Sequence, residues 1–177
     1  MRILTLPGWQ GSGPGHWQAR WERLHGDRRV EQSDWMLPRR GDWMARLEED
    51  LLHEPQPTVL VAHSLGCHLV AAWAAHSQHA HLVQAALLVA PPDVRRDDLP
   101  PQLYSWRAES TAPLPFRAMV IASTDDPYAS LERTEHMARD WGASLVVAGA
   151  SGHLNGESGL GDWPEGRAWL NALLDGE

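Results

Sequence analysis

The chain has 177 residues, of which 43% are hydrophobic and 21% are charged, and these values are typical of a globular protein rather than a disordered one. Its 15 basic and 23 acidic residues give a net charge of −8, which argues against nucleic acid as a partner. All the basic residues are Arg. The absence of Lys excludes Schiff-base chemistry and the lysine of a phosphate-binding P-loop.

The single cysteine, Cys67, cannot form an internal disulfide, which fits a reducing compartment. Too few residues precede Pro7 to form the core of a signal peptide. The longest apolar stretches, such as residues 69–75, are far shorter than a membrane span. We therefore expect a cytoplasmic protein without a membrane partner.

Short apolar runs alternate with helical patterns along the first half of the chain. A strand is expected at residues 3–6, before a glycine-rich stretch at 7–15, and a weak strand near Val30. Asp42 is a plausible N-cap for a helix. Apolar residues at helical spacing predict two buried helix faces, formed by Trp17, Trp21 and Leu24 and by Trp43, Leu47 and Leu51.

The pattern continues to the end of the chain. Residues 58–62 form a continuous, β-branched run, as expected of a strand buried on both faces. Three further strands are expected at residues 85–90, 118–122 and 145–148, and three further helices at 65–76, 127–141 and about 164–174. A proline-rich, charged loop is expected at 91–102. Such alternation predicts one α/β domain over residues 1–177, with a mostly parallel sheet of about six strands and helices on both faces.

Ligands of such sheets bind beyond the carboxyl ends of the strands, so the polar residues that follow a strand are the candidates for chemistry. Residues 61–66, Val-Ala-His-Ser-Leu-Gly, match the nucleophile elbow G-x-S-x-G with Ala62 in place of the first glycine. In this motif a strand turns sharply into a helix and exposes the hydroxyl of the serine, here Ser64. The residues two before and two after must be small, as Ala62 and Gly66 are. The alternative is an ordinary strand-to-helix turn with a serine N-cap.

A serine nucleophile needs a histidine base, and the base needs a carboxylate to hold its tautomer. His153 follows a late strand and is flanked by glycine, whereas the other histidines near the elbow lie in or beside helices. Asp125 and Asp126 follow the preceding strand, in the chain order of the hydrolase fold. Asp126 precedes Pro127 and is therefore also a possible N-cap, so the pattern alone does not choose between the two aspartates.

Four glycines among residues 8–15 make a loop that lacks both the Walker lysine and the G-x-G-x-x-G phasing. An oxyanion loop fits better, with the backbone N–H groups of Trp9 and Leu65 as candidate donors. Trp9, His16 and Trp17 either border this site or pack beneath the loop.

Two further groups are interpreted structurally. His76, His79 and His81 resemble a metal cluster, but without Cys or carboxylate neighbours they are better explained as a solvated helix end, and no metal or cofactor is expected. Cys67 is interpreted as a small core residue rather than a reactive thiol.

Several segments together resemble the retinoblastoma-binding protein 9 family of compact serine hydrolases in its bacterial form, and the match runs nearly end to end. They are residues 7–17, 63–67, 123–128, 152–155, 157–161 and 163–164. The resemblance implies an abbreviated α/β-hydrolase fold without a large cap domain. It also implies that Ser64 is the nucleophile, His153 the base and Asp126 the acid.

The resemblance implies hydrolysis of small carboxylic esters or related acyl compounds, with a small-molecule acyl substrate as the partner. The sequence does not indicate the acyl specificity or the oligomeric state. The competing hypothesis is a binding or regulatory protein that keeps the fold without catalysis.

Overall fold

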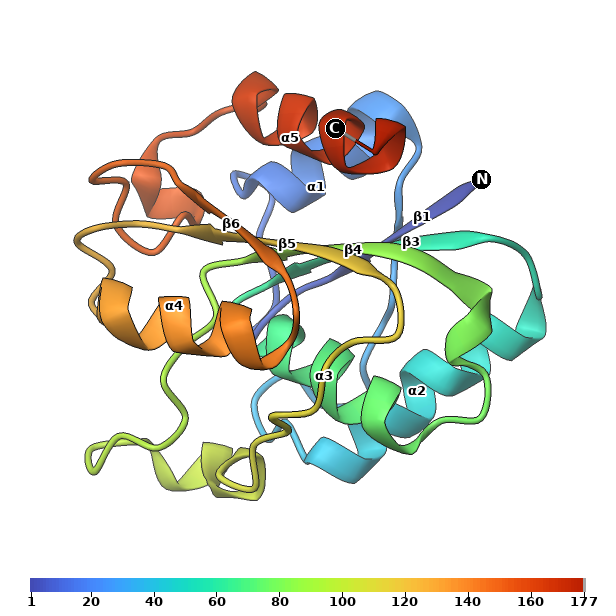
Figure 1. Ribbon diagram of the computed structural model, residues 1–177, viewed down its shortest axis with the longest axis horizontal. Coiled ribbons are helices and arrows are strands. Elements are labelled where there is room, and N and C mark those ends of the chain that lie inside the picture. The colour runs from blue at the N-terminus through green and yellow to red at the C-terminus, as the bar shows by residue number, and fades with distance from the viewer. Residues whose placement is uncertain (177) are drawn as a thin grey trace.

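The computed structural model describes residues 1–176, and its strands form one parallel sheet between two layers of helices (Figure 1). The strand order is β2-β1-β3-β4-β5-β6, and every pair of neighbours is parallel. The strands are β1 (Arg2–Leu6), β2 (Arg28–Arg29), β3 (Thr58–His63), β4 (Val83–Val89), β5 (Arg117–Ala122) and β6 (Ser144–Val147). This confirms the predicted α/β class and strand number. Glu177, the last residue of the predicted domain, lies outside the described residues.

The helices cover both faces of the sheet. On one face lie α1 (Trp17–His25) and α5 (Pro164–Asp175), and on the other lie α2 (Arg40–His53), α3 (Leu65–His76) and α4 (Leu131–Asp140) (Figure 1). Each face has its own buried hydrophobic cluster. Residues of β3 and β4 contribute side chains to both clusters, which is why these strands are continuous apolar runs in the sequence. No helix within residues 1–176 is long and apolar enough to cross a membrane.

Tryptophan supplies the large aromatic side chains of both clusters, in a chain with only one Phe. Buried indoles need a hydrogen-bond acceptor for their N–H, and for Trp17 and Trp106 the acceptors are carbonyl oxygens of loops. Trp17 Nε1 donates to Leu154 O at 2.8 Å, and Trp106 Nε1 donates to Pro38 O at 2.6 Å. The first of these bonds ties the segment after β6 to α1, so this core residue fixes the backbone next to His153.

Two helices begin elsewhere than the sequence indicates. The helix expected after Asp42 already begins at Arg40, because Pro38 and the extended Arg39 lead directly into the first turn and Asp42 lies within that turn. The helix expected from Pro127 begins only at Leu131, where Ser130 is the N-cap and its side chain accepts the N–H of Arg133. The residues after Asp126 are therefore a loop rather than a helix.

The predicted buried face of α1 is wrong at one position. Leu24 is 56% exposed, whereas Gln18 is fully buried. The Gln18 amide donates to Val61 O in β3 at 3.0 Å and its Oε1 accepts from the Ser12 hydroxyl at 2.7 Å. These bonds satisfy a buried polar side chain and attach the glycine-rich loop to the central sheet.

Candidate active site

Ser64 lies between β3 and α3 with φ 55° and ψ −124°, outside the regions that L-residues ordinarily occupy. Such a conformation persists only where the surrounding structure enforces it, and strained backbone of this kind gathers at functional sites. The Ser64 N–H donates to Val89 O of the adjacent strand at 2.9 Å, which holds the turn against the sheet. The predicted strand, turn and helix are all present at this motif.

Two glycines allow the chain to close around the serine. A Cβ on Gly66 would overlap the carbonyl oxygen of Leu6, so α3 can lie this close to β1 only with glycine here. A Cβ on Gly8 would lie 2.9 Å from Ser64 Cβ and 3.2 Å from Leu65 N. The glycine-rich loop therefore passes directly beside the Ser64 side chain.

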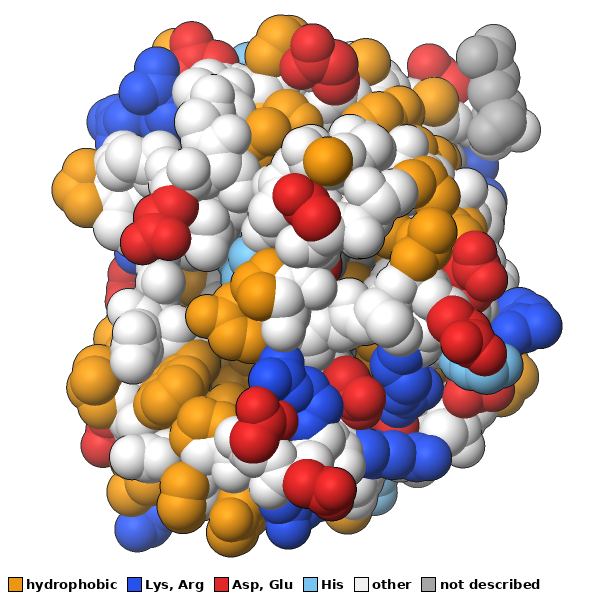
Figure 2. All heavy atoms as spheres, turned by 90° about the vertical axis from the view of Figure 1, so that its left-hand side faces the viewer, with side chains coloured by type: hydrophobic (Ala, Val, Ile, Leu, Met, Phe, Trp, Pro, Cys, Tyr) orange, Lys and Arg blue, Asp and Glu red, His pale blue; other side chains and the backbone are white. Residues whose placement is uncertain are grey.

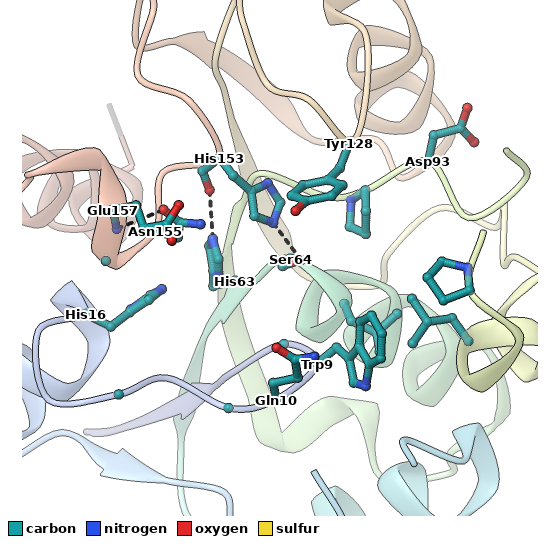
Figure 3. Close-up of a pocket in the computed structure, with 18 of the residues that line it drawn as sticks. Trp9, Gln10, His16, His63, Ser64, Asp93, Tyr128, His153, Asn155 and Glu157 are labelled. Carbon is teal, nitrogen blue, oxygen red and sulfur yellow. Dashed lines mark hydrogen bonds between the residues drawn. The ribbon is translucent and has the colours of Figure 1, made fainter. Parts of the chain in front are cut away.

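The loop after β6 brings His153 to the serine. His153 Nε2 lies 2.8 Å from Ser64 Oγ, and His153 Nδ1 lies 3.0 Å from both carboxylate oxygens of Asp126 (Figure 3 shows the contact with Ser64). The side chains of His153 and Asp126 are only 9% and 4% exposed. A hydroxyl, an imidazole and a carboxylate thus form one hydrogen-bonded row. The Nδ1 proton faces the carboxylate, which leaves Nε2 free to accept a proton.

The structure separates the two aspartates that the sequence pattern left equal. Asp126 contacts His153 and also accepts the N–H of Tyr128 at 2.9 Å. Asp125 instead accepts the Ser123 hydroxyl and the Gly152 N–H through Oδ1, both at 2.8 Å. These bonds lower the pKa of Asp125, the Ser123 hydroxyl most strongly. Asp125 therefore fixes the loop that carries the histidine, and Asp126 touches the histidine itself.

The two backbone N–H groups expected at an oxyanion site are both without a hydrogen-bond acceptor among residues 1–176. Trp9 follows Gly8 in the loop beside the serine, and Leu65 is the first residue of α3. The Trp9 indole is held separately, since its Nε1 donates to Met36 O at 2.9 Å. Unpaired N–H groups beside a nucleophile are available to stabilise a negative oxygen.

His63 adjoins His153, and His16 in turn adjoins His63. His16 was one of the residues considered for the border of the site, whereas no sequence pattern assigned His63 to it. His63 Nε2 lies 2.9 Å from His153 O, and its ring centroid is 4.9 Å from that of His153 (Figure 3). The His16 ring lies 4.7 Å from the His63 ring. Burial lowers the pKa of His63 well below its usual value and lowers the pKa of His16 to about 4, so both rings are neutral at pH 7. The signal that could have found them is their place beside the elbow and the glycine loop.

These residues surround a cavity of about 820 Å³ at the carboxyl ends of the strands. Figure 2 looks onto this end of the molecule and shows histidine atoms in a hollow with hydrophobic side chains beside it. Trp9 and His16 line the cavity, whereas Trp17 is 1% exposed and lies in the core. Residues 91–103 of the β4–β5 connection supply one wall, including Pro92, Leu99 and Leu103.

The groups interpreted as structural have defined surroundings. His79 Nδ1 lies 2.6 Å from Glu48 Oε1 of α2, a carboxylate that is distant in sequence and was not expected beside these histidines. Residues 1–176 contain no cluster of three or more His, Cys, Asp or Glu placed to hold a metal ion. Cys67 is buried, and burial raises the pKa of its thiol well above the usual value, so it is a poor nucleophile.

A parallel sheet with an elbow serine, followed along the chain by an aspartate and then a histidine, defines the α/β-hydrolase class. The chain belongs to the serine hydrolase family, whose family model matches residues 3–172. This confirms the resemblance drawn from the sequence. None of the curated proteins matches the sequence.

Solved structures agree with this fold. A putative YdeN-like hydrolase from Pectobacterium atrosepticum is 28% identical, with a TM-score of 0.86 over 97% of this chain and 89% of its own. The YdeN protein of Bacillus subtilis is 20% identical, with a TM-score of 0.76 over 98% of each chain. The carboxylesterase CesB of Bacillus subtilis is 12% identical, with a TM-score of 0.65 over 99% of this chain and 84% of its own.

Proposed function

We propose that this protein hydrolyses small carboxylic esters through an acyl-enzyme on Ser64. The observation that carries the proposal is the row of hydrogen bonds from Ser64 Oγ through His153 to Asp126, with contacts of 2.8 and 3.0 Å. A row of this kind matches the requirement of a serine nucleophile for a base and of the base for an orienting carboxylate. The carboxylesterase among the structural neighbours shares the fold and is consistent with the same chemistry.

In the first half of the reaction, Ser64 Oγ forms a bond to the carbonyl carbon while its proton passes to His153 Nε2. The carbonyl oxygen becomes an oxyanion, which the N–H groups of Leu65 and Trp9 bind. The bond between the carbonyl carbon and the alcohol oxygen then breaks, and the alcohol takes the proton from Nε2. Asp126 stabilises the imidazolium and keeps its Nδ1 proton in place.

In the second half, a water molecule gives a proton to His153 Nε2 and its oxygen attacks the acyl carbon. The bond from the acyl carbon to Ser64 Oγ breaks, and Oγ recovers the proton. The carboxylic acid leaves the cavity, which is open enough to exchange small molecules. No metal or redox group takes part in any of these steps. The cavity size fits a small-molecule acyl substrate.

The test is hydrolysis of nitrophenyl esters and acyl thioesters of graded chain length by the wild type and by Ser64→Ala. We expect Ser64→Ala to lose at least about 10³-fold in kcat/KM while keeping its fold. Ser144→Ala is the matched control, because Ser144 lies on the exposed edge strand β6, and it should keep its activity. Activity of Ser64→Ala within about tenfold of wild type would overturn the assignment. A wild type without turnover of any of these compounds would favour the binding protein instead.

A further inference from the structure

The cavity beside Ser64 has two chemically different walls. One wall, called the apolar wall below, carries the side chains of Trp9, Leu65, Leu99 and Leu103, and the charged residues Asp93, Arg96 and Asp98 lie on the same β4–β5 connection at its margin. The opposite wall is polar and is formed by His16, Asn155 and Glu157, with backbone of the glycine-rich loop beside it (Figure 3). An ester whose two halves differ in polarity would match such a cavity.

His16 is the member of the polar wall with an unmet hydrogen bond. The residue is 6% exposed, and its Nδ1 accepts the backbone N–H of Gln18 at 3.1 Å. Because Nδ1 is an acceptor, the proton of the neutral ring lies on Nε2. Nε2 is buried and has no partner within residues 1–176. Buried N–H groups are rarely left unpaired, so an orphaned donor on a cavity wall indicates a bond to a water molecule or to a ligand that replaces it.

The His16 ring is held in place from several sides. It packs 4.7 Å from the His63 ring and 5.3 Å from the Trp17 ring, measured between centroids. A pKa of about 4, caused first by burial, keeps the ring uncharged at neutral pH. Nε2–H is therefore a fixed, neutral donor.

The rest of the wall restricts what that donor can bind. Asn155 Oδ1 already accepts the Glu157 N–H at 3.1 Å and the Ser158 hydroxyl at 3.4 Å, which leaves the Asn155 amide N–H₂ as a donor. Glu157 adds an acceptor with negative charge. An anionic ligand would be repelled by Glu157, and an ammonium group has no lone pair to accept from His16. A hydroxyl group both accepts and donates, so it matches this set.

The polar wall also lies on the same side of the cavity as His153, the proposed base. His153 must give its proton to the departing alcohol, so the alcohol lies next to its imidazole. The His63 ring lies between the two, 4.9 Å from the His153 ring and 4.7 Å from the His16 ring. The apolar wall then remains for the acyl group.

We propose that His16, Asn155 and Glu157 form a subsite for the alcohol half of the ester, and that it selects an uncharged polyol whose hydroxyl accepts the Nε2–H of His16. This subsite rests on the proposed ester hydrolysis and specifies its substrate class as short acyl esters of polyols.

The test compares 1-monoacetylglycerol with propyl acetate, which share the acyl group and the carbon count of the alcohol. Release of acetic acid is titrated at constant pH. His16→Asn removes the Nε2 donor but keeps an oxygen near the Nδ1 position for the Gln18 N–H, and asparagine is a good N-cap. We expect the wild type to prefer the glycerol ester, and His16→Asn to reduce that preference about tenfold, the equivalent of one hydrogen bond. His81→Asn, an exposed histidine far along the chain, is the control and should leave the preference unchanged.

If His16→Asn leaves the preference for the glycerol ester unchanged, whether or not it lowers activity on both esters equally, the subsite is overturned. A second readout is independent of turnover. In Ser64→Ala, 1-monoacetylglycerol should shift the His16 ring signals in NMR spectra, whereas propyl acetate should not. Shifted signals together with no turnover by the wild type would support the subsite and contradict ester hydrolysis. Turnover of both esters without a shift of the His16 ring signals would support ester hydrolysis and contradict the subsite.

Discussion

Exchanging each of the neighbouring aspartates for asparagine should separate their roles. Both oxygens of Asp126 lie 3.0 Å from His153 Nδ1, so an amide at this position turns N–H₂ or its oxygen toward the ring. When N–H₂ faces Nδ1, the ring proton moves to Nε2, and Nε2 can no longer accept the Ser64 proton. The equivalent change in serine proteases lowers kcat by about 10⁴, which corresponds to roughly 5.5 kcal/mol at about 1.36 kcal/mol per tenfold change.

Asp125→Asn should be much milder. Only Oδ1 of Asp125 accepts the Ser123 hydroxyl and the Gly152 N–H, and asparagine keeps an oxygen of the same geometry. We expect its kcat to stay within about tenfold of wild type, because a small displacement of the His153 loop costs far less than a wrong tautomer. Steady-state kinetics of both variants on one ester, with circular dichroism to confirm folding, measure the difference. A larger loss in Asp125→Asn than in Asp126→Asn would refute this assignment of roles.

Three predictions concern stability. The pKa of His16 is about 4 in the folded protein and 6.5 ordinarily, so between these pH values the unfolded chain binds a proton that the folded chain does not. The free energy of unfolding should therefore fall by up to about 3 kcal/mol as the pH is lowered from about 6.5 to 4. Urea titrations across this pH range should show a shallower fall in His16→Asn than in the wild type. Glu109, 2% exposed at its side chain, binds Arg95 and Arg133. Because Arg95 is 56% exposed and Arg133 keeps Asp93 as a partner at 3.3 Å, Glu109→Ala should cost about 1–3 kcal/mol in the same titration, and an unchanged free energy of unfolding would contradict this. In Gly66→Ala the new Cβ should overlap the carbonyl oxygen of Leu6, and strain of about 1–3 kcal/mol should lower the melting temperature by several degrees. Gly41→Ala is the control, because the space around a Cβ at this position is open, and its melting temperature should not fall below that of the wild type.

Local patterns were sufficient for most of the fold. The run at β3 and the apolar helix α3 were predicted to within a residue, because burial on both faces leaves a continuous apolar signal. Helix starts were less predictable, since Asp42 has a capping side chain but the chain already turns into a helix at Arg40. The exposure of Leu24 depends on which part of α1 packs against the sheet, and the spacing of apolar residues in the sequence does not specify that contact.

The candidate site was predicted in part for a related reason. The elbow and the late histidine have local signatures, so Ser64 and His153 could be chosen from the sequence. The choice of Asp126 came from family resemblance, because it depends on which carboxylate reaches a loop 27 residues further along. The unpaired Nε2 of His16 depends on how Trp17, Gln18 and His63 surround the ring, and no sequence pattern describes such an enclosure.

Labelling with a fluorophosphonate probe tests the central claim most directly, because the probe reacts with a serine only when a base has activated it. The intact wild-type protein should gain one probe per chain, and mass spectrometry of its peptides should place the probe on Ser64. Ser64→Ala should remain unlabelled under the same conditions. A folded wild type that takes up no probe, or takes it up at another serine with Ser64 unmodified, would contradict the account.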